Sequence, residues 1–332
     1  MNILILGAGG NVSQGIIRTI LNSGLKCKLI TACVSERAFG FYMSNKSYIS
    51  PYANDANFIP WLIEICNKEA IEIILTGVEE NIEKIAQNIE ILNKKTNAIF
   101  ISSTPEQLKI GNDKLLTAQW LKNNQCNFPS YADLSNKEKV AELIKKEGFP
   151  LIAKPRKGKG SNGVIIINNK KELNKISNLK NYVLQKYLGD EDNEYTVACY
   201  YDKYNKFKDM IIMKRRLENG TTIEAESVFN QEIYDECKKI CEKFKPIGPL
   251  NIQLRVHNSK PVCFELNVRF SGTTPIRALL GYNDLEALIK EYVLNQSIDN
   301  CFNIKKGKVI RYLTEQYVHL VSINKFNDEV CL

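Results

Sequence analysis

Histidine is almost absent from this sequence of 332 residues, in which the only two are His257 and His319. A metal site built on several histidines, or a relay of histidines that carries protons, is therefore not favoured. A Ser-His-Asp hydrolase would need one of these two residues, and neither lies in a setting typical of that triad. Each is expected to be a half-buried strand residue.

The sequence also lacks a long apolar run and a basic-then-apolar leader. No transmembrane helix or secretory signal is predicted, and the cytoplasm is the expected compartment. None of the 10 cysteines forms a Cys-x-x-Cys pair. Cys237 and Cys241 lie four residues apart on a predicted helix, a spacing that could suit a metal. Without a second pair, packing in a reduced core is the favoured interpretation.

The charge is positive overall, with a formal net charge of +8. One interpretation is a lysine-rich solvated surface, and the other is that part of the excess faces an anionic ligand. Because the sequence has no basic stripe interleaved with aromatic residues, no nucleic-acid partner is expected. No membrane partner is expected either, and a homodimer is left open.

A chain of this length is expected to form two or three domains. In its N-terminal part, apolar strands near 3–6, 28–34, 71–76 and 98–101 alternate with helices near 11–22, 58–66 and 79–92. This alternation predicts a doubly wound α/β domain with a parallel sheet over residues 1–103. A helix with Pro105 at its first position follows. From residue 151, short strands predict an α+β region that ends in a strand near 309–317.

A glycine turn, Gly7-Ala8-Gly9-Gly10, follows the first predicted strand and is similar to a dinucleotide-binding loop. The dinucleotide fingerprint needs a third glycine for close packing of helix on strand, and Val12 stands there. It also needs an acid at the end of the second strand, which here ends Thr31-Ala32-Cys33. An NAD(P)-dependent oxidoreductase is therefore only an alternative. Such a turn can also hold another anion or simply reverse the chain.

The most informative segment runs from Ala153 to Val164, where Lys154 ends a predicted strand and a loop rich in glycine and cations follows. Glycines let backbone N–H groups approach a polyphosphate, and the cations neutralise its charge. The spacing differs from that of a Walker loop, in which Gly-Lys-Ser/Thr opens a helix. Taken alone, the segment is also compatible with a basic hairpin turn.

A second group of polar residues alternates along a later strand. Glu265, Asn267 and Arg269 share one strand face because side chains alternate with a period of two. Gln253, on the neighbouring predicted strand, points to the same place. Oxygen ligands beside a guanidinium suit Mg²⁺ bridging phosphates, with Arg269 gripping a phosphoryl group. The alternative is a solvated strand face, but apolar residues at the intervening positions and the Gly/Thr-rich turn that follows disfavour it.

Together these segments resemble the ATP-grasp superfamily, and within it the carbamoyl-phosphate-synthetase-like carboxylate–amine ligases. The resemblance covers nearly the whole chain. It implies an α+β ATP-grasp fold in which two subdomains clasp ATP: a helical linker and small lid subdomain over 104–187, and a large subdomain with the metal and substrate site over 188–332. Lys154, Asn267 and Arg269 are the residues expected to be catalytic.

The resemblance assigns a role to each residue that matches the family pattern. These roles are phosphate contact by Lys114 and Lys154, the lid loop with Arg156, Gly158, Gly160, Ser161 and Gly163, adenine contact by Gln185, Lys186, Tyr187 and Leu188, ribose binding by Glu194, metal binding by Gln253, Glu265 and Asn267, and phosphoryl stabilisation by Arg269. Gln185 stands where many relatives have an acid. Gln253 makes the metal site one charge poorer than a carboxylate would, although synthetase-like relatives also use glutamine there.

The implied activity is that of an ATP-dependent carbon–nitrogen ligase with ATP and Mg²⁺ (or Mn²⁺) as cofactors. A small carboxylic or amino acid would become an acyl phosphate, from which an amine displaces phosphate. The candidate substrate residues are Asn11, Arg216, Ser271, Gly272, Thr273 and Arg311. Besides the oxidoreductase, three alternatives remain: a carboxylase-like ligase, a thiol-forming ligase, and a regulatory protein that binds ATP without catalysis. The complete set of Glu265, Asn267 and Arg269 disfavours the regulatory protein.

Overall fold

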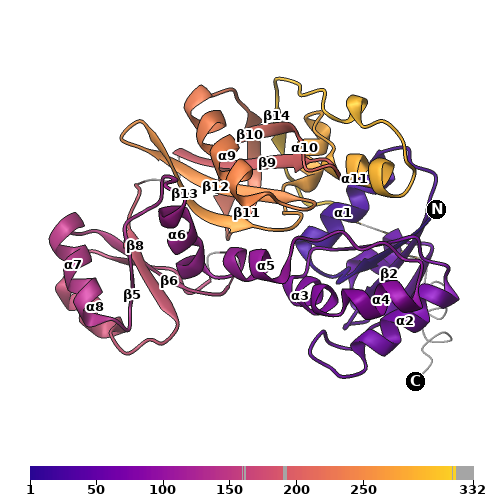
Figure 1. The fold of residues 1–332 in the computed structure, drawn as a ribbon, viewed down its shortest axis with the longest axis horizontal. Coiled ribbons are helices and arrows are strands. Elements are labelled where there is room, and N and C mark those ends of the chain that lie inside the picture. Colours follow the sequence, from indigo (N-terminus) through magenta and orange to yellow (C-terminus); the bar gives the residue numbers. More distant parts are fainter. Residues whose placement is uncertain (159, 161, 190–192, 316, 319–332) are drawn as a thin grey trace.

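The computed structural model describes residues 1–158, 160, 162–189, 193–315 and 317–318. These residues form three sheets, of four, six and four strands. Figure 1 shows an elongated molecule with the N-terminal sheet at one end and the small sheet of the chain's middle part at the other. Within the described part, no helix is both long enough and apolar enough to span a membrane.

The N-terminal region is a parallel sheet with helices on both faces. Its elements are β1 (Asn2–Leu6), α1 (Asn11–Asn22), β2 (Lys28–Cys33), the 3₁₀ helix η1 (Phe39–Met43), β3 (Lys46–Ile49), α2 (Phe58–Lys68), β4 (Ile73–Thr76), α3 (Glu79–Gln87) and α4 (Ile89–Lys95). The strand order is β3-β2-β1-β4. Ile3 and Ile5 pack toward α1, whereas Leu4 and Leu6 pack toward α2, because side chains alternate along a strand. The predicted doubly wound domain is confirmed.

Local boundaries differ from the sequence-based expectations at three places. The helix expected over 79–92 is divided at Asn88, whose amide donates to the carbonyl of Lys84 and competes with the helical ladder. The strand expected over 98–101 pairs with β4 only through a bridge between Ile99 and Ile73. In the described part, the strand expected over 309–317 extends only over Lys308–Ile310.

Two helices connect the N-terminal region to the rest of the chain. They are α5 (Pro105–Gly111) and α6 (Lys114–Asn123). Thr104 caps α5 in a reciprocal pair with Gln107, and Pro105 occupies the first turn as predicted. Asp113 caps α6 by accepting from the backbone N–H groups of Leu115 and Leu116.

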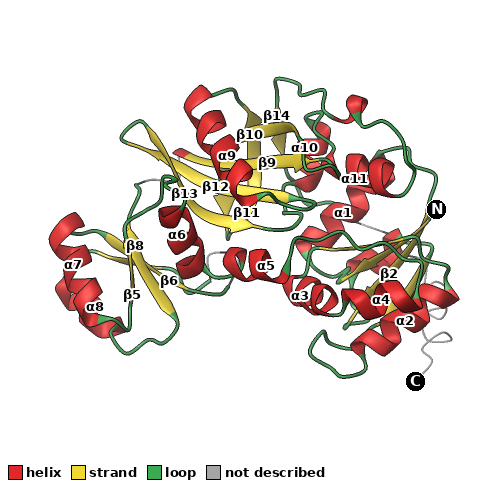
Figure 2. Ribbon diagram, in the orientation of Figure 1, coloured by secondary structure: helices red, strands yellow, loops and turns green. Residues whose placement is uncertain are grey.

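The small sheet buries one face under helices and leaves the other facing the large sheet. Its elements are β5 (Tyr131–Asp133), α7 (Lys137–Glu147), β6 (Leu151–Pro155), β7 (Ile165–Ile167), α8 (Lys170–Ile176) and β8 (Tyr182–Lys186), in the strand order β5-β8-β6-β7. Leu151, Ala153 and Leu184 form the core with α7 and α8, which lie on the outer side in Figure 2. Ile152 and Lys154, at the alternate positions of β6, therefore face inward.

The large sheet is antiparallel and has six strands in the order β13-β12-β9-β10-β11-β14. Its elements are β9 (Glu194–Tyr201), β10 (Phe207–Glu218), β11 (Thr221–Ser227), α9 (Gln231–Phe244), β12 (Leu250–His257), β13 (Lys260–Asn267), α10 (Thr274–Leu279), α11 (Asp284–Tyr292), the 3₁₀ helix η3 (Asp299–Cys301) and β14 (Lys308–Ile310). Val197 and Cys199 pack against α9, whereas Ala198 and Tyr200 pack on the side of α1, α10 and α11. The prediction of an α+β region is confirmed.

The cysteines are packing residues. All nine that the structure describes are free thiols, and eight of them are buried. Cys237 and Cys241 lie in the core between α9 and the large sheet. Among the described residues, no cluster of histidine, cysteine and acidic side chains could hold a metal ion. The reduced-core interpretation therefore agrees with the observed packing.

A buried ion pair holds α10 to α11. Arg277 donates through Nε and Nη2 to the two carboxylate oxygens of Asp284 at 2.8 and 2.6 Å, and both side chains are 1% exposed. Its Nη1 donates to the hydroxyl of Ser271 at 3.0 Å. The turn after β13 is thereby tied to the core that the large sheet shares with α1.

Asp284→Asn should lower the free energy of unfolding by roughly 3–5 kcal/mol, because it leaves the Arg277 charge buried without a counter-charge. Urea unfolding would measure the change. As a control, Glu142→Gln removes an exposed ion pair with Lys139 and should leave the unfolding midpoint unchanged. Equal midpoints for both variants and the wild type would show that the buried pair does not stabilise the fold.

Candidate functional site

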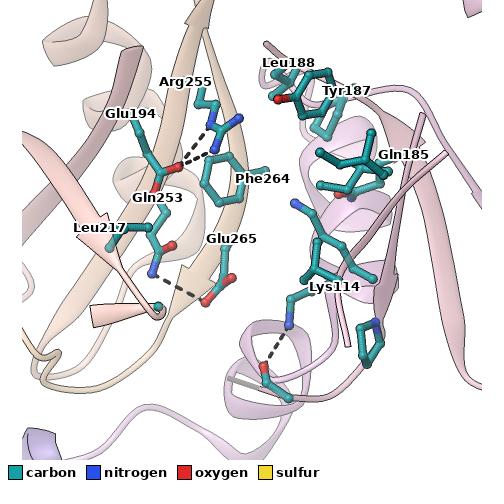
Figure 3. Close-up of a pocket in the computed structure, with 18 of the residues that line it drawn as sticks. Lys114, Gln185, Tyr187, Leu188, Glu194, Leu217, Gln253, Arg255, Phe264 and Glu265 are labelled. Carbon is teal, nitrogen blue, oxygen red and sulfur yellow. Dashed lines mark hydrogen bonds and ion pairs between the residues drawn. The ribbon is translucent and has the colours of Figure 1, made fainter. Parts of the chain in front are cut away.

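A cavity of about 370 Å³ lies between the small and the large sheet. Lys154 and Gln185 line it from β6 and β8, and Glu194, Gln253 and Glu265 line it from β9, β12 and β13. Figure 3 shows Lys114, Gln185, Tyr187 and Leu188 on one side of the cavity and the large-sheet residues on the other. The cavity therefore brings together residues that are up to 151 positions apart (Lys114 to Glu265).

Lys154 places a positive charge where solvent is largely excluded. Its Nζ lies 4.6 Å from the ring centre of Phe264, which is buried on β13. Burial lowers the pKa of Lys154 to about 8, and the nearby positive charge of Lys114 acts in the same direction, whereas Glu265 opposes the shift. A lysine with a lowered pKa in a cavity is a candidate for binding an anion, because an anion restores its charged form.

Lys114, at the start of α6, is held close to the loop that follows β6. Its Nζ donates to the carbonyl of Gly158 at 2.9 Å, and its backbone N–H donates to the carbonyl of Arg156 at 2.9 Å. Arg156 does not point into the cavity. Its guanidinium pairs with Asp113 at 2.7 Å and with Asp133 at 3.4 Å. Arg156 thus anchors the base of the loop to the cap of α6.

Glu194, the first residue of β9, lies between two arginines. Arg215 Nη2 lies 2.6 Å from Glu194 Oε1, and Arg255 Nη2 lies 2.8 Å from Glu194 Oε2. Burial by itself would raise the pKa of Glu194, but Arg215 and Arg255 outweigh that effect and hold it below its ordinary value. The carboxylate is therefore ionised, and the three side chains together leave a net positive charge.

Gln185 is the most buried polar side chain of the cavity wall. It is 1% exposed, and neither its amide nitrogen nor its amide oxygen has a hydrogen-bond partner within the described chain. Buried amide groups are nearly always paired, because an unpaired buried donor or acceptor costs about 1–3 kcal/mol. A ligand edge that offers both an acceptor and a donor would satisfy Gln185.

The three predicted metal ligands lie together, with the amides of Asn267 and Gln253 directed at the carboxylate of Glu265. Asn267 Nδ2 and Gln253 Nε2 lie 3.0 and 3.5 Å from Glu265 Oε1. Gln253 Oε1 accepts from Arg215 at 2.8 Å. One carboxylate and two amides provide too few ligands to bind a metal ion without a phosphate ligand. The set suits Mg²⁺, which is usually bound by one or two carboxylates together with substrate phosphates and water.

Family models match most of the chain. Residues 111–273 match the ATP-grasp domain, and residues 3–99 match the PylC-like N-terminal domain. The second match covers the parallel-sheet region, and the first covers the small sheet and most of the large sheet. Residues 111–273 therefore form a domain of the ATP-grasp family.

Solved structures with a similar fold include a carboxyaminoimidazole synthetase and a biotin carboxylase. N5-carboxyaminoimidazole synthetase from Staphylococcus aureus, complexed with ADP, has a TM-score of 0.71 and 19% identity over 89% of this chain and 78% of that chain. Biotin carboxylase from Campylobacter jejuni, in a β-γ-ATP complex, has a TM-score of 0.71 and 19% identity over 92% of this chain and 74% of that chain. The predicted ATP-grasp fold is confirmed.

Most residues that the ATP-grasp pattern singled out line the cavity. They are Lys114, Lys154, Gly158, Gly160, Gln185, Lys186, Tyr187, Leu188, Glu194, Gln253 and Glu265. Lys186 turns its amine toward Glu147, 2.8 Å away. Ser161 lies outside the described residues. Gly163 is in the left-handed region at φ 73° and packs beside Pro155.

Arg269 lies outside the cavity. Its Nη2 pairs at 2.6 Å with Glu79, at the start of α3 in the N-terminal region, and its Nη1 donates to the carbonyl of Phe270. The ion pair joins the segment after β13, which carries the predicted metal ligands Glu265 and Asn267, to the N-terminal domain. The phosphoryl-stabilising role of Arg269 stays a prediction.

The candidate substrate residues separate into two groups. Asn11, Ser271, Gly272, Thr273 and Arg311 lie around the turn after β13: Arg311 Nη2 donates to the carbonyl of Gly272 at 2.5 Å, and Asn11 lies beside Gly272. Arg216 is exposed, and alternation along β10 directs it to the face opposite that of Arg215. The structure therefore does not bring Arg216 to the others.

Three residues that shape the charge of the cavity, Arg215, Arg255 and Phe264, are absent from the site residues predicted from the sequence. Arg255 follows Gln253 by two positions on β12 and so shares its face, a signal that strand alternation carries. Arg215 belongs to the Lys214-Arg215-Arg216 run, in which only the pairing of β10 with β9 decides which arginine faces Glu194. Nothing in the sequence identifies Phe264 as the ring beneath Lys154.

The Lys154 amine should titrate near pH 8 in the free protein, and tripolyphosphate should move that titration to higher pH, because a bound anion favours the charged amine. Nuclear magnetic resonance of reductively dimethylated lysines would follow it, with Lys154→Met identifying the signal. A Lys154 signal that titrates near pH 10 and ignores tripolyphosphate would contradict the buried environment.

Proposed function

We propose that this protein is a Mg·ATP-dependent carboxylate–amine ligase that acts on a small carboxylic or amino acid through an acyl phosphate. The arrangement that carries the proposal is a pair of lysines, Lys114 and Lys154, on one side of the ATP-grasp cavity, with Gln253 and Glu265 on the other. Phosphoryl transfer needs little beyond positioning and charge stabilisation, and such a cavity supplies both. Both similar structures described above are nucleotide complexes.

The base of ATP is proposed to bind at the end of β8. Gln185 offers one unpaired donor and one unpaired acceptor, and the edge of adenine presents an amino group beside a ring nitrogen, which is the complementary pattern. Tyr187 and Leu188 line the same side of the cavity. The ionised Glu194 can accept hydrogen bonds from the ribose hydroxyls.

The phosphate chain is proposed to lie across the two lysines. Lys114 and Lys154 neutralise it, and the loop with Gly158 and Gly160 covers it. Mg²⁺, when bound with ATP, would be held by Gln253, Glu265 and Asn267 and would offset the charge of the β- and γ-phosphates. For this role the two amides must turn their oxygens toward the cation, which a half-turn about the last side-chain torsion allows.

The acid and the amine are proposed to enter on the side of the N-terminal domain. The substrate carboxylate attacks the γ-phosphorus to form an acyl phosphate and ADP, and the amine then attacks the acyl carbon and releases phosphate. No protein nucleophile takes part. The main contribution of the chain is to hold the reacting groups together and to exclude water from the acyl phosphate. Arg269 can assist only if its guanidinium exchanges Glu79 for the transferred phosphoryl group.

The decisive experiment measures ADP release from Mg·ATP against a panel of carboxylic and amino acids, each with and without amines. Release should require one acid and increase with its amine. Glu265→Gln should lower kcat about 100-fold or more, because it removes the one carboxylate of the proposed metal site. The matched control is Glu224→Gln on β11, which is paired with Lys308 and does not line the cavity.

Two outcomes would count against the ligase. Tight binding of Mg·ATP with no ADP release for any acid would favour the non-catalytic nucleotide-binding protein. Absence of nucleotide binding would remove the proposal altogether.

A side chain at Gly220 should disturb nucleotide binding, because the turn that carries Gly220 packs closely against Gly160 of the loop after β6. Gly220, in the β10–β11 turn, has a φ of 72°, and a Cβ there would lie 2.4 Å from the backbone of Gly160. Gly220→Ala should therefore hold the loop open and raise the KM for ATP about tenfold, more than backbone strain alone would cause. Steady-state kinetics would measure it.

Gly24→Ala is the matched control for backbone strain, because Gly24 has a φ of 73° with no atom near its Cβ position. Equal effects of Gly24→Ala and Gly220→Ala on the KM would show that contact between the turn and the loop is irrelevant to nucleotide binding.

A further inference from the structure

A second groove lies between α1, α10 and the C-terminal segment that includes β14. Its volume is about 290 Å³, and it shares no lining residue with the cavity between the sheets. Arg18 lines it from α1 and Arg311 lines it from the residue after β14. Figure 1 shows α1 and α10 close together on the side of the molecule away from the small sheet. The groove is thus a separate feature of the fold.

Both arginines carry buried nitrogen atoms without acceptors. Within the described chain, neither Arg18 Nε nor Arg311 Nη1 has a hydrogen-bond partner, although each atom is shielded from solvent. The described lining of the groove contains no aspartate or glutamate. Burial lowers the pKa of Arg311, and the neighbouring Arg18 lowers it further. The two guanidinium groups therefore repel one another, and no acidic side chain among the described lining residues offsets their charge.

This arrangement is unfavourable unless an anion completes it. A buried, unpaired donor costs free energy, and like charges in a low-dielectric setting repel. Water could accept the hydrogen bonds but would leave the repulsion in place. A carboxylate would accept the hydrogen bonds and would also offset the repulsion with its negative charge. Its two oxygens accept from guanidinium groups in a planar arrangement. Arg18 Nε and Arg311 Nη1 are the unpaired groups that would donate to such a carboxylate.

The remaining walls of the groove favour an organic anion. Ile276 and Leu279 of α10 and Val309 of β14 supply aliphatic surface, and the side chains of Asn22 and Asn283 add polar groups. Concave sites with apolar walls and a few convergent polar groups are typical of small-molecule sites. An inorganic anion would leave the aliphatic walls unused.

We propose that the Arg18–Arg311 groove is a second ligand site, which binds a small carboxylate that carries an aliphatic group. The site does not depend on the ligase proposal, since none of its residues line the nucleotide cavity. Arg311 also donates to the carbonyl of Gly272, in the turn that follows the metal-site strand. A carboxylate bound by Arg311 would therefore be connected to that turn through the hydrogen bond between Arg311 and Gly272.

The test uses sodium hexanoate as the probe and isothermal titration calorimetry at fixed ionic strength. Hexanoate should bind saturably to the wild-type protein, and uncharged hexanamide should bind at least tenfold more weakly. Arg18→Gln and Arg311→Gln should each weaken hexanoate at least tenfold. Arg37→Gln, which removes an exposed arginine outside the groove, and Lys154→Met, which alters only the other cavity, should leave its affinity unchanged.

Three results would overturn the proposal. Hexanoate that fails to bind the wild type, or that binds Arg18→Gln equally well, would show that the groove is not the site. Inorganic phosphate that binds Lys154→Met more tightly than hexanoate does, and that loses affinity in Arg18→Gln, would assign the groove to a different ligand. Loss of hexanoate binding in Lys154→Met alone would place the probe in the nucleotide cavity.

Thermal unfolding separates a ligand role from a structural one. Without probe, Arg18→Gln should unfold at the wild-type temperature or higher, because it removes a repulsive charge. With saturating hexanoate, the wild type, Arg37→Gln and Lys154→Met should gain stability, whereas Arg18→Gln and Arg311→Gln should gain little. A lower unfolding temperature for unliganded Arg18→Gln, with no change in its response to hexanoate, would make Arg18 a packing residue and contradict the proposal.

Discussion

The enclosed positive charge of Lys154 is the constraint around which the site is built. Burial disfavours that charge and lowers the pKa to about 8, yet no carboxylate forms an ion pair with the amine among the described residues. Phe264 supports it from one side, and Glu265 acts on it only at longer range. The nearby Glu194 carboxylate is already shared by Arg215 and Arg255. The cavity therefore has an excess of positive charge, and a polyanion would relieve the electrostatic strain.

Strand alternation is what places that charge. On the small sheet, the apolar faces of β6 and β8 pack on α7 and α8, so the alternate side chains must face the large sheet. On the large sheet, the same rule directs Gln253, Arg255 and Glu265 to the cavity. Two amphipathic faces thus meet with their polar sides together. Gly158 and Gly160, after β6, also line the cavity. The backbone of Gly160 lies too close to Gly220 to leave room for a side chain at Gly220.

The N-terminal domain is coupled to this site at the end of β13. Arg269 pairs with Glu79, Gly15 of α1 packs against Pro275 of α10, and Arg277 joins the turn to the buried Asp284. These contacts hold the N-terminal domain to the turn that follows the predicted metal ligands. Arg311 reaches the same turn from the C-terminal side through Gly272. The chain from Glu265, which lines the cavity between the sheets, to Gly272, which accepts from Arg311, therefore connects that cavity with the Arg18–Arg311 groove.

The sequence by itself determined the order of the domains, most of the strand and helix positions, and the residues on the polar faces of β6, β12 and β13, because these follow from local periodicity and from glycine and proline placement. It could not determine which sheet faces which. The orientation of Arg215, the ring beneath Lys154 and the unpaired amide of Gln185 depend on contacts between strands that are distant in the chain. Arg269 shows the limit most clearly, since its alternation with Glu265 and Asn267 was visible, but its ion pair with Glu79 joins positions 190 residues apart. Side-chain direction is a local property of a strand, whereas the partner it meets is set by how whole sheets and domains pack.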